Sequence, residues 1–506
     1  MTDFFIIFAI IAYLLVTIAI GFAFSKKTSN TEDFYLGGRK MGPLVVAMSA
    51  EASDMSSWLL MGLPGVAYLT GVCDAAWTAI GLALGTWLNW FFVSRRLRRY
   101  SSNLNAITVP GFFAKRFHDD KNIITAIAAI VIVVFFVPYT ASGFAACGKL
   151  FNALFDVDYT VAMVISALVI VGYTILGGFG AVCTTDLIQS VVMSIALITV
   201  VFFGVSQAGG LGAIIDNAKE LPGYLSLTST HDAVNGTSNS YGIITIVSTM
   251  AWGLGYFGMP HILVRFMSIK DEKKLVLSRR IATMWVIIAM GVAVFIGVVG
   301  LGLSNAGIFE TLSDPETVIM KITDVLSEYG IFAALIAGVI LAGILAATMS
   351  TADSQMLAAA SSISHNVVKD FLKVKISEKK EILIARITII GIALLGMFLA
   401  SDPNSSVFNI VSFAWAGFGG AFGAVTLCSL FWKRCNLAGA LAGMISGGAM
   451  VFIWKYAVRP LGGIFDIYEL LPAFITSFVV IVIVSLATKK PSEEILKEFE
   501  AAKSEN

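Results

Sequence analysis

Apolar runs of about 20 residues recur along the chain, separated by short polar stretches. A run of this length can cross the hydrocarbon core of a bilayer as one helix. The pattern therefore predicts an all-α integral membrane protein with about thirteen transmembrane helices. The expected spans are 4–24, 43–69, 73–93, 123–151, 159–180, 187–207, 241–267, 281–303, 330–364, 383–400, 407–431, 437–457 and 467–488.

Basic residues gather in alternate loops between these spans. The loops predicted on one side hold all but five of the 34 Lys and Arg residues, with Lys26, Lys27 and Arg265 among those they hold. The five on the other side are Lys149, Lys219, Lys321, Lys455 and Arg459. Cytoplasmic loops carry an excess of Lys and Arg. The distribution therefore predicts an N-terminus outside and a C-terminus in the cytoplasm.

The spans form one transmembrane domain over residues 1–488, followed by a cytoplasmic tail at 489–506. The tail could form a short amphipathic helix, but a solvated tail is favoured. The long loops 208–240 and 304–328 are rich in Asn, Ser, Gly and Asp. That composition suits solvated loops with short surface helices.

Composition narrows the functional classes. Only 13% of the residues are charged and the net charge is +1, which argues against nucleic acid as a partner. The five cysteines are scattered without a CxxC pair, so neither a metal site nor a disulfide is expected. The four histidines are dispersed, and no HExxH motif, Ser/His pairing or nucleotide-binding loop is present. We therefore do not expect an enzyme.

Two spans are interrupted, at AEASDMSSW in the second and GLGYFGMP in the seventh. In lipid, freed backbone groups are tolerated only where they line a cavity or bind a ligand. The five-span separation fits two inverted repeats, about 43–207 and 241–431, with 4–24, 437–457 and 467–488 as extra helices. Paired breaks of this kind mark binding sites in transporters. Two unrelated kinks are the alternative.

Polar side chains in these spans suggest a cation site. Asp54, beside Ser53, Ser56 and Ser57, could neutralise a cation or could cap a half-helix. Glu51 shares a face with Asp54 only if the helix is continuous. A second polar cluster lies in the ninth span. Hydroxyls in a membrane helix often only donate to the carbonyl four residues earlier, but this cluster also contains a carboxylate within one turn, which favours a cation site. Its members are Ser350, Thr351, Asp353 and Ser354.

Two further features leave their roles open. Asp186, expected at the start of the sixth span, is either a functional carboxylate or an N-cap residue. Trp252, Tyr256 and Pro260 have the spacing of one helical stripe, with Tyr139 on the fourth span as a companion. Such a stripe either packs in the core or forms an apolar slot for a small ring.

The stretches SAEASDMSSWLLMGLPG, TTDLIQ, WGLGYFGMPHILVRFM and LAATMSTADSQ resemble the bacterial sodium/proline symporters of the sodium/solute symporter family. The resemblance runs from the first span through the twelfth. It implies the five-plus-five inverted-repeat fold of the leucine-transporter type in the bacterial cytoplasmic membrane. It also implies symport of sodium and L-proline into the cell by alternating access, with no obligate protein partner evident.

The resemblance also implies roles for individual residues. The sodium ligands are expected to be the carbonyls of Ala52, Met55 and Ala347 and the hydroxyls of Ser350 and Thr351, with Asp54 required for sodium affinity. The substrate-side residues are expected to be Ser56, Ser57, Trp58, Tyr139, Trp252, Tyr256 and Pro260. Arg39 and Asp186 match polar residues linked to coupling and cytoplasmic release.

The chain departs from the best-known member of that family at several positions. That member has glycine at Glu51 and Ser57, serine at Asp353 and glutamine at Met259. Asp353 could approach Asp186, and with Ser354 this suggests a second cation site. Another small solute, such as an amino or organic acid, a sugar or pantothenate, is an alternative substrate, and a channel is a further alternative.

Overall fold

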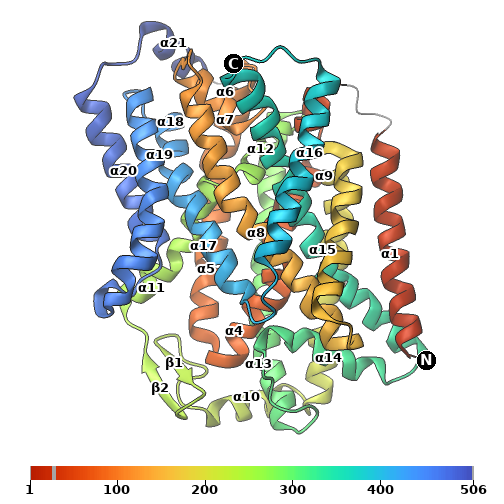
Figure 1. The fold of residues 1–506 in the computed structure, drawn as a ribbon. Helices are drawn as coiled ribbons and strands as arrows, with labels where there is room; N and C mark the ends of the chain where they lie inside the picture. Colours follow the sequence, from red (N-terminus) through yellow and green to blue (C-terminus); the bar gives the residue numbers. More distant parts are fainter. Residues whose placement is uncertain (1, 26–29, 504–506) are drawn as a thin grey trace.

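Long helices run side by side through the molecule, and short elements lie at its two ends (Figure 1). The computed structural model describes residues 2–25 and 30–503, so Lys26 and Lys27 lie outside the described residues. Within the described residues, ten helices are long and apolar enough to cross a membrane, and one bent pair raises the number to eleven. The predicted multi-span helical architecture is confirmed, whereas the number of thirteen spans is not.

The helices in the first half of the chain are α1 Thr2–Ser25, α2 Thr31–Leu36, α3 Pro43–Ser57, α4 Leu63–Thr70, α5 Val72–Leu88, α6 Ser94–Asn103, α7 Val109–Arg116, α8 Ile123–Phe155, α9 Tyr159–Gln207, α10 Leu211–Glu220 and α11 Ile243–Met250. Those in the second half are α12 Pro260–Ser268, α13 Leu275–Asn305, α14 Val318–Ser327, α15 Ile331–Ser361, α16 Glu378–Leu399, α17 Val407–Phe418, α18 Ala424–Phe431, α19 Leu437–Ile453, α20 Leu470–Ala487 and α21 Glu493–Ala501. Strands β1 Ser229–Asp232 and β2 Thr237–Ser240 pair as an antiparallel hairpin.

Both predicted helix breaks are present. The first lies at Ser56, whose φ of 49° and ψ of −173° separate α3 from a π-helical turn, Trp58–Gly62, that leads into α4. The second follows α11, where a 3-10 segment, Ala251–Phe257, and an extended Met259 precede α12. The two parts of this second segment are bent by 46°. Each break therefore places irregular backbone in the interior of the bundle.

A kink in α9 lies earlier than expected. Gly178, with φ 62° and ψ −172°, divides the 49-residue helix, and a Cβ there would approach the Phe34 ring to 2.9 Å. The sequence predicts a connection between 180 and 187, but these residues are helical. Asp186 therefore lies inside a helix, and of the two roles that the sequence left open, the N-cap role is excluded.

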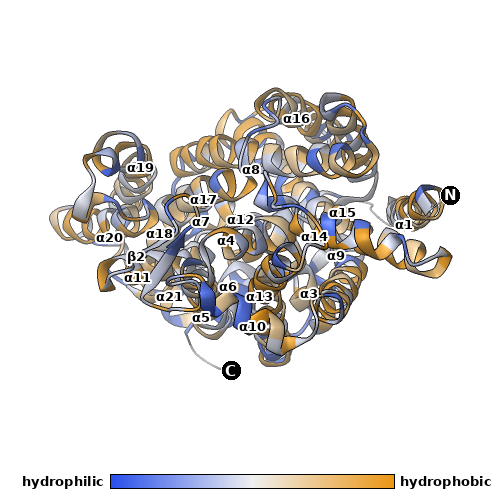
Figure 2. Cartoon of the chain, turned by 90° about the horizontal axis from the view of Figure 1, so that it is seen from below, coloured by the Kyte–Doolittle hydropathy of each residue, from blue (hydrophilic) through white to orange (hydrophobic). Residues whose placement is uncertain are grey.

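Apolar side chains cover the outside of the bundle as well as its core. Phe8 and Leu15 on α1, Leu394 on α16 and Ile483 on α20 are all more than half exposed. Figure 2 shows these peripheral helices coloured mainly as hydrophobic residues. In a membrane protein such a surface faces lipid, because lipid tails solvate it as well as a protein core does.

Short elements cover one end of the bundle. The β1–β2 hairpin, α10 and α14 lie at the lower end in Figure 1. The sequence predicts short surface helices in these loops, but α14 buries Val318, Ile319, Met320 and Ile322. Its apolar residues recur at the helical period, so one face of α14 packs against the bundle. The prediction of a solvated loop is wrong for this segment.

The C-terminal segment is also packed against the molecule. Helix α21 lies at the upper end with α6 and α7 (Figure 1) and buries Ile495 and Phe499. The guanidinium carbons of Arg96 and Arg116 lie 4.6 Å and 5.1 Å from the centre of the Phe499 ring. The prediction of a solvated tail is therefore wrong for residues 493–501. The apolar face of α21 is too short for the sequence pattern to predict its burial, but it is sufficient to hold the helix against the molecule.

Replacing Phe499 with alanine is expected to release α21. Truncating a buried phenylalanine costs about 3–5 kcal/mol, which exceeds what the remaining contacts of a nine-residue helix supply. Amide hydrogen exchange over 493–503 is expected to speed up by at least 100-fold, while α15 keeps its protection. Lys497→Ala, on the exposed face of the same helix, is the control, and equal exchange in the two variants would contradict the proposed docking.

Candidate functional site

The first helix break faces the middle of α15 through oxygen atoms. The Ser350 hydroxyl donates to the Ala52 carbonyl at 2.7 Å and approaches the Ala347 carbonyl at 3.1 Å. The Thr351 hydroxyl donates to the same Ala347 carbonyl at 3.1 Å. The structure thus brings together four of the predicted oxygen ligands. Carbonyl and hydroxyl oxygens are the ligands that hard cations prefer.

Asp54 lies beside this group and joins three elements. Its Oδ2 accepts a hydrogen bond from the Tyr256 hydroxyl, and its carbonyl accepts one from the Tyr139 hydroxyl at 3.1 Å. The other carboxylate oxygen, Oδ1, is buried and has no hydrogen-bond partner within the described residues. The capping role that the sequence left open has no support, because the carboxylate bonds to a side chain and not to backbone amides. A buried carboxylate with a free oxygen is suited to holding a cation.

The residues after Asp54 shape the break. The Trp58 amide donates to the Ser56 hydroxyl at 3.1 Å, and the Met55 carbonyl also receives the Trp58 N–H. The Met55 carbonyl is therefore engaged in the turn, unlike the carbonyl of Ala52, which meets a side chain of α15. The Ser57 hydroxyl is buried and has no partner in the described part of the chain.

A small cavity opens next to Asp54. It is lined by Asp54, Met55, Trp58, Leu82, Tyr139, Trp252, Met290, Val411 and Trp415. Five of the predicted site residues thus share one cavity, and four of its nine lining residues are aromatic. Trp415 on α17 was not predicted. Its indole donates to the Trp252 carbonyl at 2.7 Å, and its ring meets the Tyr256 ring edge-on at 5.1 Å between centres.

Aromatic rings separate this cavity from a second, polar pocket that Trp252 also lines. The centre of the Trp252 ring lies 5.5 Å from Trp58, 5.6 Å from Phe408 and 5.1 Å from Tyr468. We call these four residues the aromatic lid. Phe408 and Tyr468 were not predicted as site residues, because nothing in the sequence distinguishes them from other apolar positions. The polar pocket includes Thr230 of β1, so the lid lies on the side of the hairpin.

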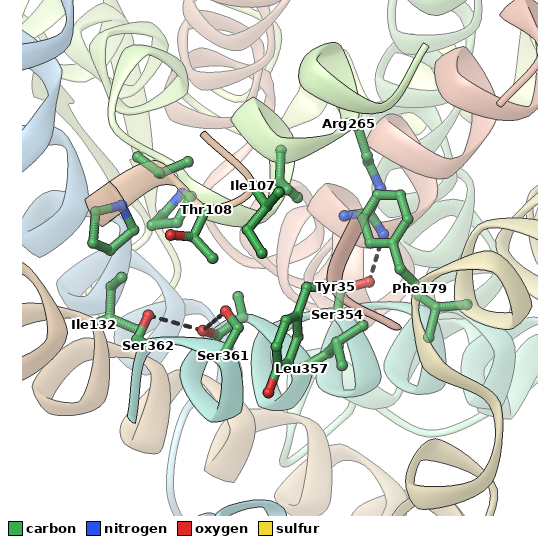
Figure 3. Close-up of a pocket in the computed structure, with 16 residues that line it drawn as sticks. Tyr35, Ile107, Thr108, Ile132, Phe179, Arg265, Ser354, Leu357, Ser361 and Ser362 are labelled. Carbon is green, nitrogen blue, oxygen red and sulfur yellow. Dashed lines mark hydrogen bonds between the residues drawn. The ribbon is translucent and has the colours of Figure 1, made fainter. Parts of the chain in front are cut away.

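Pro260 lies in a different pocket from Trp252. The 3-10 segment and the extended Met259 interrupt the helical stripe that the spacing predicts, so that prediction is wrong. Pro260 lines a pocket with Tyr35, Phe179, Arg265 and Ser361. Figure 3 shows this inner pocket, with the Arg265 guanidinium bonded to the hydroxyl of Ser354.

A buried ion pair closes one wall of the inner pocket. Arg265 Nη2 lies 2.8 Å from Asp186 Oδ2, and Ser49 donates to the same oxygen at 2.6 Å. The exposed fractions of the Arg265 and Asp186 side chains are 1% and 0%. From the sequence, Arg265 was counted among the residues of an inner loop, but it belongs to α12. That assignment is wrong, and the burial makes this pair part of the site.

Asp353 is connected to this ion pair through a hydroxyl. Arg265 Nη2 donates to the Ser354 hydroxyl at 2.6 Å, and Ser354 donates to Asp353 Oδ1 at 3.2 Å. The Tyr173 hydroxyl donates to Asp353 Oδ2 at 2.7 Å and lies 3.0 Å from the Met349 carbonyl. The expected approach of Asp353 to Asp186 is therefore present in this network. Tyr173 was not predicted.

Arg39 binds backbone carbonyls near the inner pocket. Its guanidinium donates to Met267 at 2.9 Å and Ala106 at 2.6 Å, which ties the chain before α3 to α12 and to the loop before α7. Burial lowers the pKa of Arg39 to about 10, so the group stays charged at neutral pH. Arg39 thus lies outside the central cavity and links the segment before α3 to α12 and to the loop before α7.

Glu51 points away from the α15 oxygens. Its Oε1 accepts a hydrogen bond from the Trp90 indole at 3.0 Å, and its Oε2 has no hydrogen-bond partner within the described residues. The side chain is 1% exposed, which excludes a water-solvated role in this conformation. Trp90 on the turn after α5 was not predicted, since nothing in its own stretch of sequence marks it.

A second charged network holds the end of α17 near the aromatic lid. The Lys149 ammonium lies 2.8 Å from Glu316, whose carboxylate also accepts the backbone N–H groups of Val407 and Phe408 at 3.1 Å and 3.0 Å. A carboxylate at a helix N-terminus is stabilised by the helix dipole. Glu316 therefore fixes the helix turn that carries Phe408 of the lid.

Comparisons with known proteins point to one family. The model of the "Sodium:solute symporter family" matches residues 34–447. A sodium/proline symporter of Staphylococcus aureus is 40% identical over 489 residues, which cover 95% of this chain and 92% of that protein. The protein of that name from S. aureus strain NCTC 8325 is 41% identical over 490 residues, with the same coverage.

Two solved structures share the fold. A Na+-coupled sialic acid symporter superposes with a TM-score of 0.79 at 18% identity, covering 97% of this chain and all of that one. A transporter of the nucleobase-cation-symport-1 family has a TM-score of 0.52 at 13% identity, covering 94% of this chain and all of that one. From the family match and the curated relatives together, the chain belongs to the sodium:solute symporter family.

Proposed function

We propose that this protein is a secondary active transporter that carries L-proline into the bacterial cell together with sodium. The identity of 40% to a sodium/proline symporter over 95% of the chain is the observation that carries the proposal. The clustered oxygens of α3 and α15 and the adjoining aromatic cavity support it, because they offer a cation and a small ring neighbouring places to bind. Sodium and proline are both cargo.

Sodium is proposed to bind between the first helix break and α15. Its ligands would be the carbonyls of Ala52, Met55 and Ala347 and the hydroxyls of Ser350 and Thr351, with the Asp54 charge close by. A cation there replaces the hydrogen bond between Ser350 and Ala52 and holds α3 against α15. Because Asp54 also meets Tyr139 and Tyr256, this ordering extends to the cavity wall. Sodium and substrate then favour each other's binding, and the coupling is reciprocal.

Proline is proposed to occupy the aromatic cavity. The rings of Trp58, Tyr139, Trp252 and Trp415 line this cavity and offer an apolar ring aromatic contacts. Tyr256 contacts Asp54 and Trp415, and Ser56 and Ser57 lie in the adjoining helix break, so these three are proposed to act on the substrate from outside the cavity lining. The cavity is closed by the aromatic lid, so entry requires the lid to move. Trp415 is a wall residue that we add to those predicted from the sequence.

Transport is proposed to proceed by alternating access across thirteen spans, with the N-terminus outside and the C-terminus in the cytoplasm. The bundle would follow the five-plus-five inverted repeat, starting at α3 and α11. The aromatic lid and Glu316 then close the outer side, and the pocket at Pro260 and Arg265 leads to the cytoplasm. A membrane potential favours entry by about 2.3 kcal/mol per charge per 100 mV.

A second cation is proposed at Asp353, Ser354 and Asp186. Asp186 pairs directly with Arg265, whereas Asp353 reaches that guanidinium only through the Ser354 hydroxyl, so within the described residues its carboxylate has no ion pair of its own. Asp353→Asn is expected to lower the sodium Hill coefficient of uptake from about two toward one, because the neutral amide removes that charge. The coefficient is obtained from initial uptake rates over a sodium titration. A coefficient near one in the unmodified protein, unchanged in the variant, would contradict the second cation.

The function is tested with purified protein in proteoliposomes. Labelled proline is expected to accumulate above the external concentration only when sodium is higher outside, and unlabelled proline is expected to compete best among amino acids, organic acids, sugars and pantothenate. Better competition by another solute would reassign the substrate. Downhill flux that does not saturate would favour a channel.

A further inference from the structure

An apolar cavity of about 250 Å³ lies away from the proposed cation and proline sites. It is enclosed by α1, α8, the first part of α9 and α15. Its lining residues are Leu14, Cys147, Phe151, Val157, Ala162, Ile165, Ser166, Val169, Ile170, Leu345 and Met349. Of these, Cys147 and Ser166 carry a thiol or a hydroxyl, and none carries a charge. Neither an ion nor a polar solute suits such a wall.

One side of this cavity is continuous with the surface that faces lipid. Ile165 lines it and is 56% exposed, and Leu168 follows on the same exposed face of α9 at 60%. Across the opening, Leu15 on α1 is 61% exposed and stands beside the lining residue Leu14. The cavity therefore opens between α1 and α9 onto an apolar, lipid-facing surface.

The inner wall of the cavity is the helix that carries the proposed sodium ligands. Leu345 and Met349 line it, and both are less than 5% exposed. Met349 directly precedes Ser350. It is held by the Tyr173 hydroxyl at its carbonyl and by the Tyr13 hydroxyl, 3.8 Å from its sulfur. A molecule in the cavity would therefore pack against the residue next to Ser350.

We propose that an acyl chain of a membrane phospholipid enters between α1 and α9 and fills this cavity. Apolar cavities exclude water and bind apolar molecules, and a void left empty loses the dispersion contacts of its walls. The bilayer supplies acyl chains at the opening at very high concentration. The absence of a basic residue from the lining means that the tail, and not the headgroup, is the part recognised.

Occupancy has a consequence for α15. An acyl chain packed on Leu345 and Met349 restrains the turn that presents Ser350. Sodium binding restrains the same turn from the other side, so the two are expected to favour each other. The chain thereby acts as a structural ligand of the transporter, independently of which solute is carried.

The test uses the full-length protein in liposomes that contain a phosphatidylcholine with a diazirine at the end of one acyl chain. After irradiation, peptide sequencing by mass spectrometry locates the label. We expect label at Leu345 and Met349, which face the bilayer only through the cavity, as well as at lipid-facing residues such as Met284. Saturating sodium is expected to raise the label at Met349 by about twofold, which corresponds to a weak coupling.

Variants with a larger side chain in the cavity are compared with the unmodified protein. Ala162→Phe places a ring into the cavity from α9 and is expected to reduce label at Leu345 and Met349 at least fivefold, with label at Met284 unchanged. Ile483→Phe adds a ring to the lipid-facing side of α20, away from the opening, and is expected to leave all labelling as in the unmodified protein. Leu14→Phe fills the cavity from α1 and replaces Ala162→Phe if that variant fails to insert.

Two results would overturn the proposal. One is an unmodified protein labelled at Met284 but not at Leu345 or Met349. The other is equal label at these two residues in the filled and unfilled proteins. Neither readout depends on proline uptake, so a different substrate would leave the proposal standing.

Discussion

Replacing Asp54 with asparagine is expected to abolish sodium-stimulated proline uptake, a fall of at least about 100-fold in the initial rate. Asparagine keeps the shape and the acceptor for the Tyr256 hydroxyl but removes the carboxylate charge that joins the first helix break to the second. The free Oδ1 is the atom that loses its capacity to balance a cation. Initial rates are measured in proteoliposomes with an inward sodium gradient and normalised to inserted protein.

Two further variants separate this effect from general damage. Thr351→Ala removes a proposed ligand without changing charge and is also expected to abolish the stimulation by sodium. Glu51→Gln removes a carboxylate one helical turn from Asp54 and is expected to keep uptake within about threefold, because Glu51 bonds to Trp90 and not to the α15 oxygens. Normal sodium dependence in both Asp54→Asn and Thr351→Ala would remove the proposed cation site.

Replacing Arg265 with methionine is expected to destabilise the protein by about 3–5 kcal/mol. The substitution leaves the buried Asp186 carboxylate without its ion pair, and the same guanidinium also holds Ser354 and the carbonyl of His261. The loss is measured as a lower midpoint of thermal unfolding for the purified protein in detergent. A large part of the cost comes from the isolated charge and not from the lost attraction.

Because much of the cost comes from the isolated Asp186 charge, removing that charge as well is expected to restore stability. Arg265→Met combined with Asp186→Asn removes both charges and is expected to recover most of the lost stability, although transport stays low. Arg279→Met, which removes an arginine whose guanidinium lies over the Phe91 ring, is the control and is expected to leave the midpoint unchanged within about 1 kcal/mol. A double variant no more stable than Arg265→Met would contradict the ion-pair explanation.

The helix breaks could be predicted because their signals are local. Ser, Asp and Gly interrupting a 20-residue apolar run contradict an unbroken span wherever they occur, and both breaks are present at Ser56 and Met259. These breaks need no knowledge of the tertiary contacts. The pairing of Ser350 with Ala52, 298 positions apart, came instead from the family resemblance, which placed the two stretches in one sodium site.

Most of the missed features depend on distant partners. Arg265 resembles the other basic residues that end spans, and only the folded structure shows that its partner is Asp186 of α9. Glu316 and Lys149 are 167 positions apart, so neither stretch alone reveals that they fix α17. The Gly178 kink was misplaced because both halves of α9 are apolar, which leaves periodicity unable to locate the boundary.

The backbone at Ser56 has an energetic consequence for the whole cycle. A residue with a side chain rarely adopts φ near 49° with ψ near −173°, and holding one there costs about 1–3 kcal/mol. The first break is thus a strained conformation. The Trp58 amide, which donates to the Ser56 hydroxyl, and the contacts of Asp54 hold it in place. Energy of that size changes the ratio of two conformations by about 5- to 150-fold. A bound cation that stabilises the surrounding contacts would maintain the strained backbone conformation at Ser56. After the cation is released to the cytoplasm, relaxation of this strain would favour the return of the empty carrier.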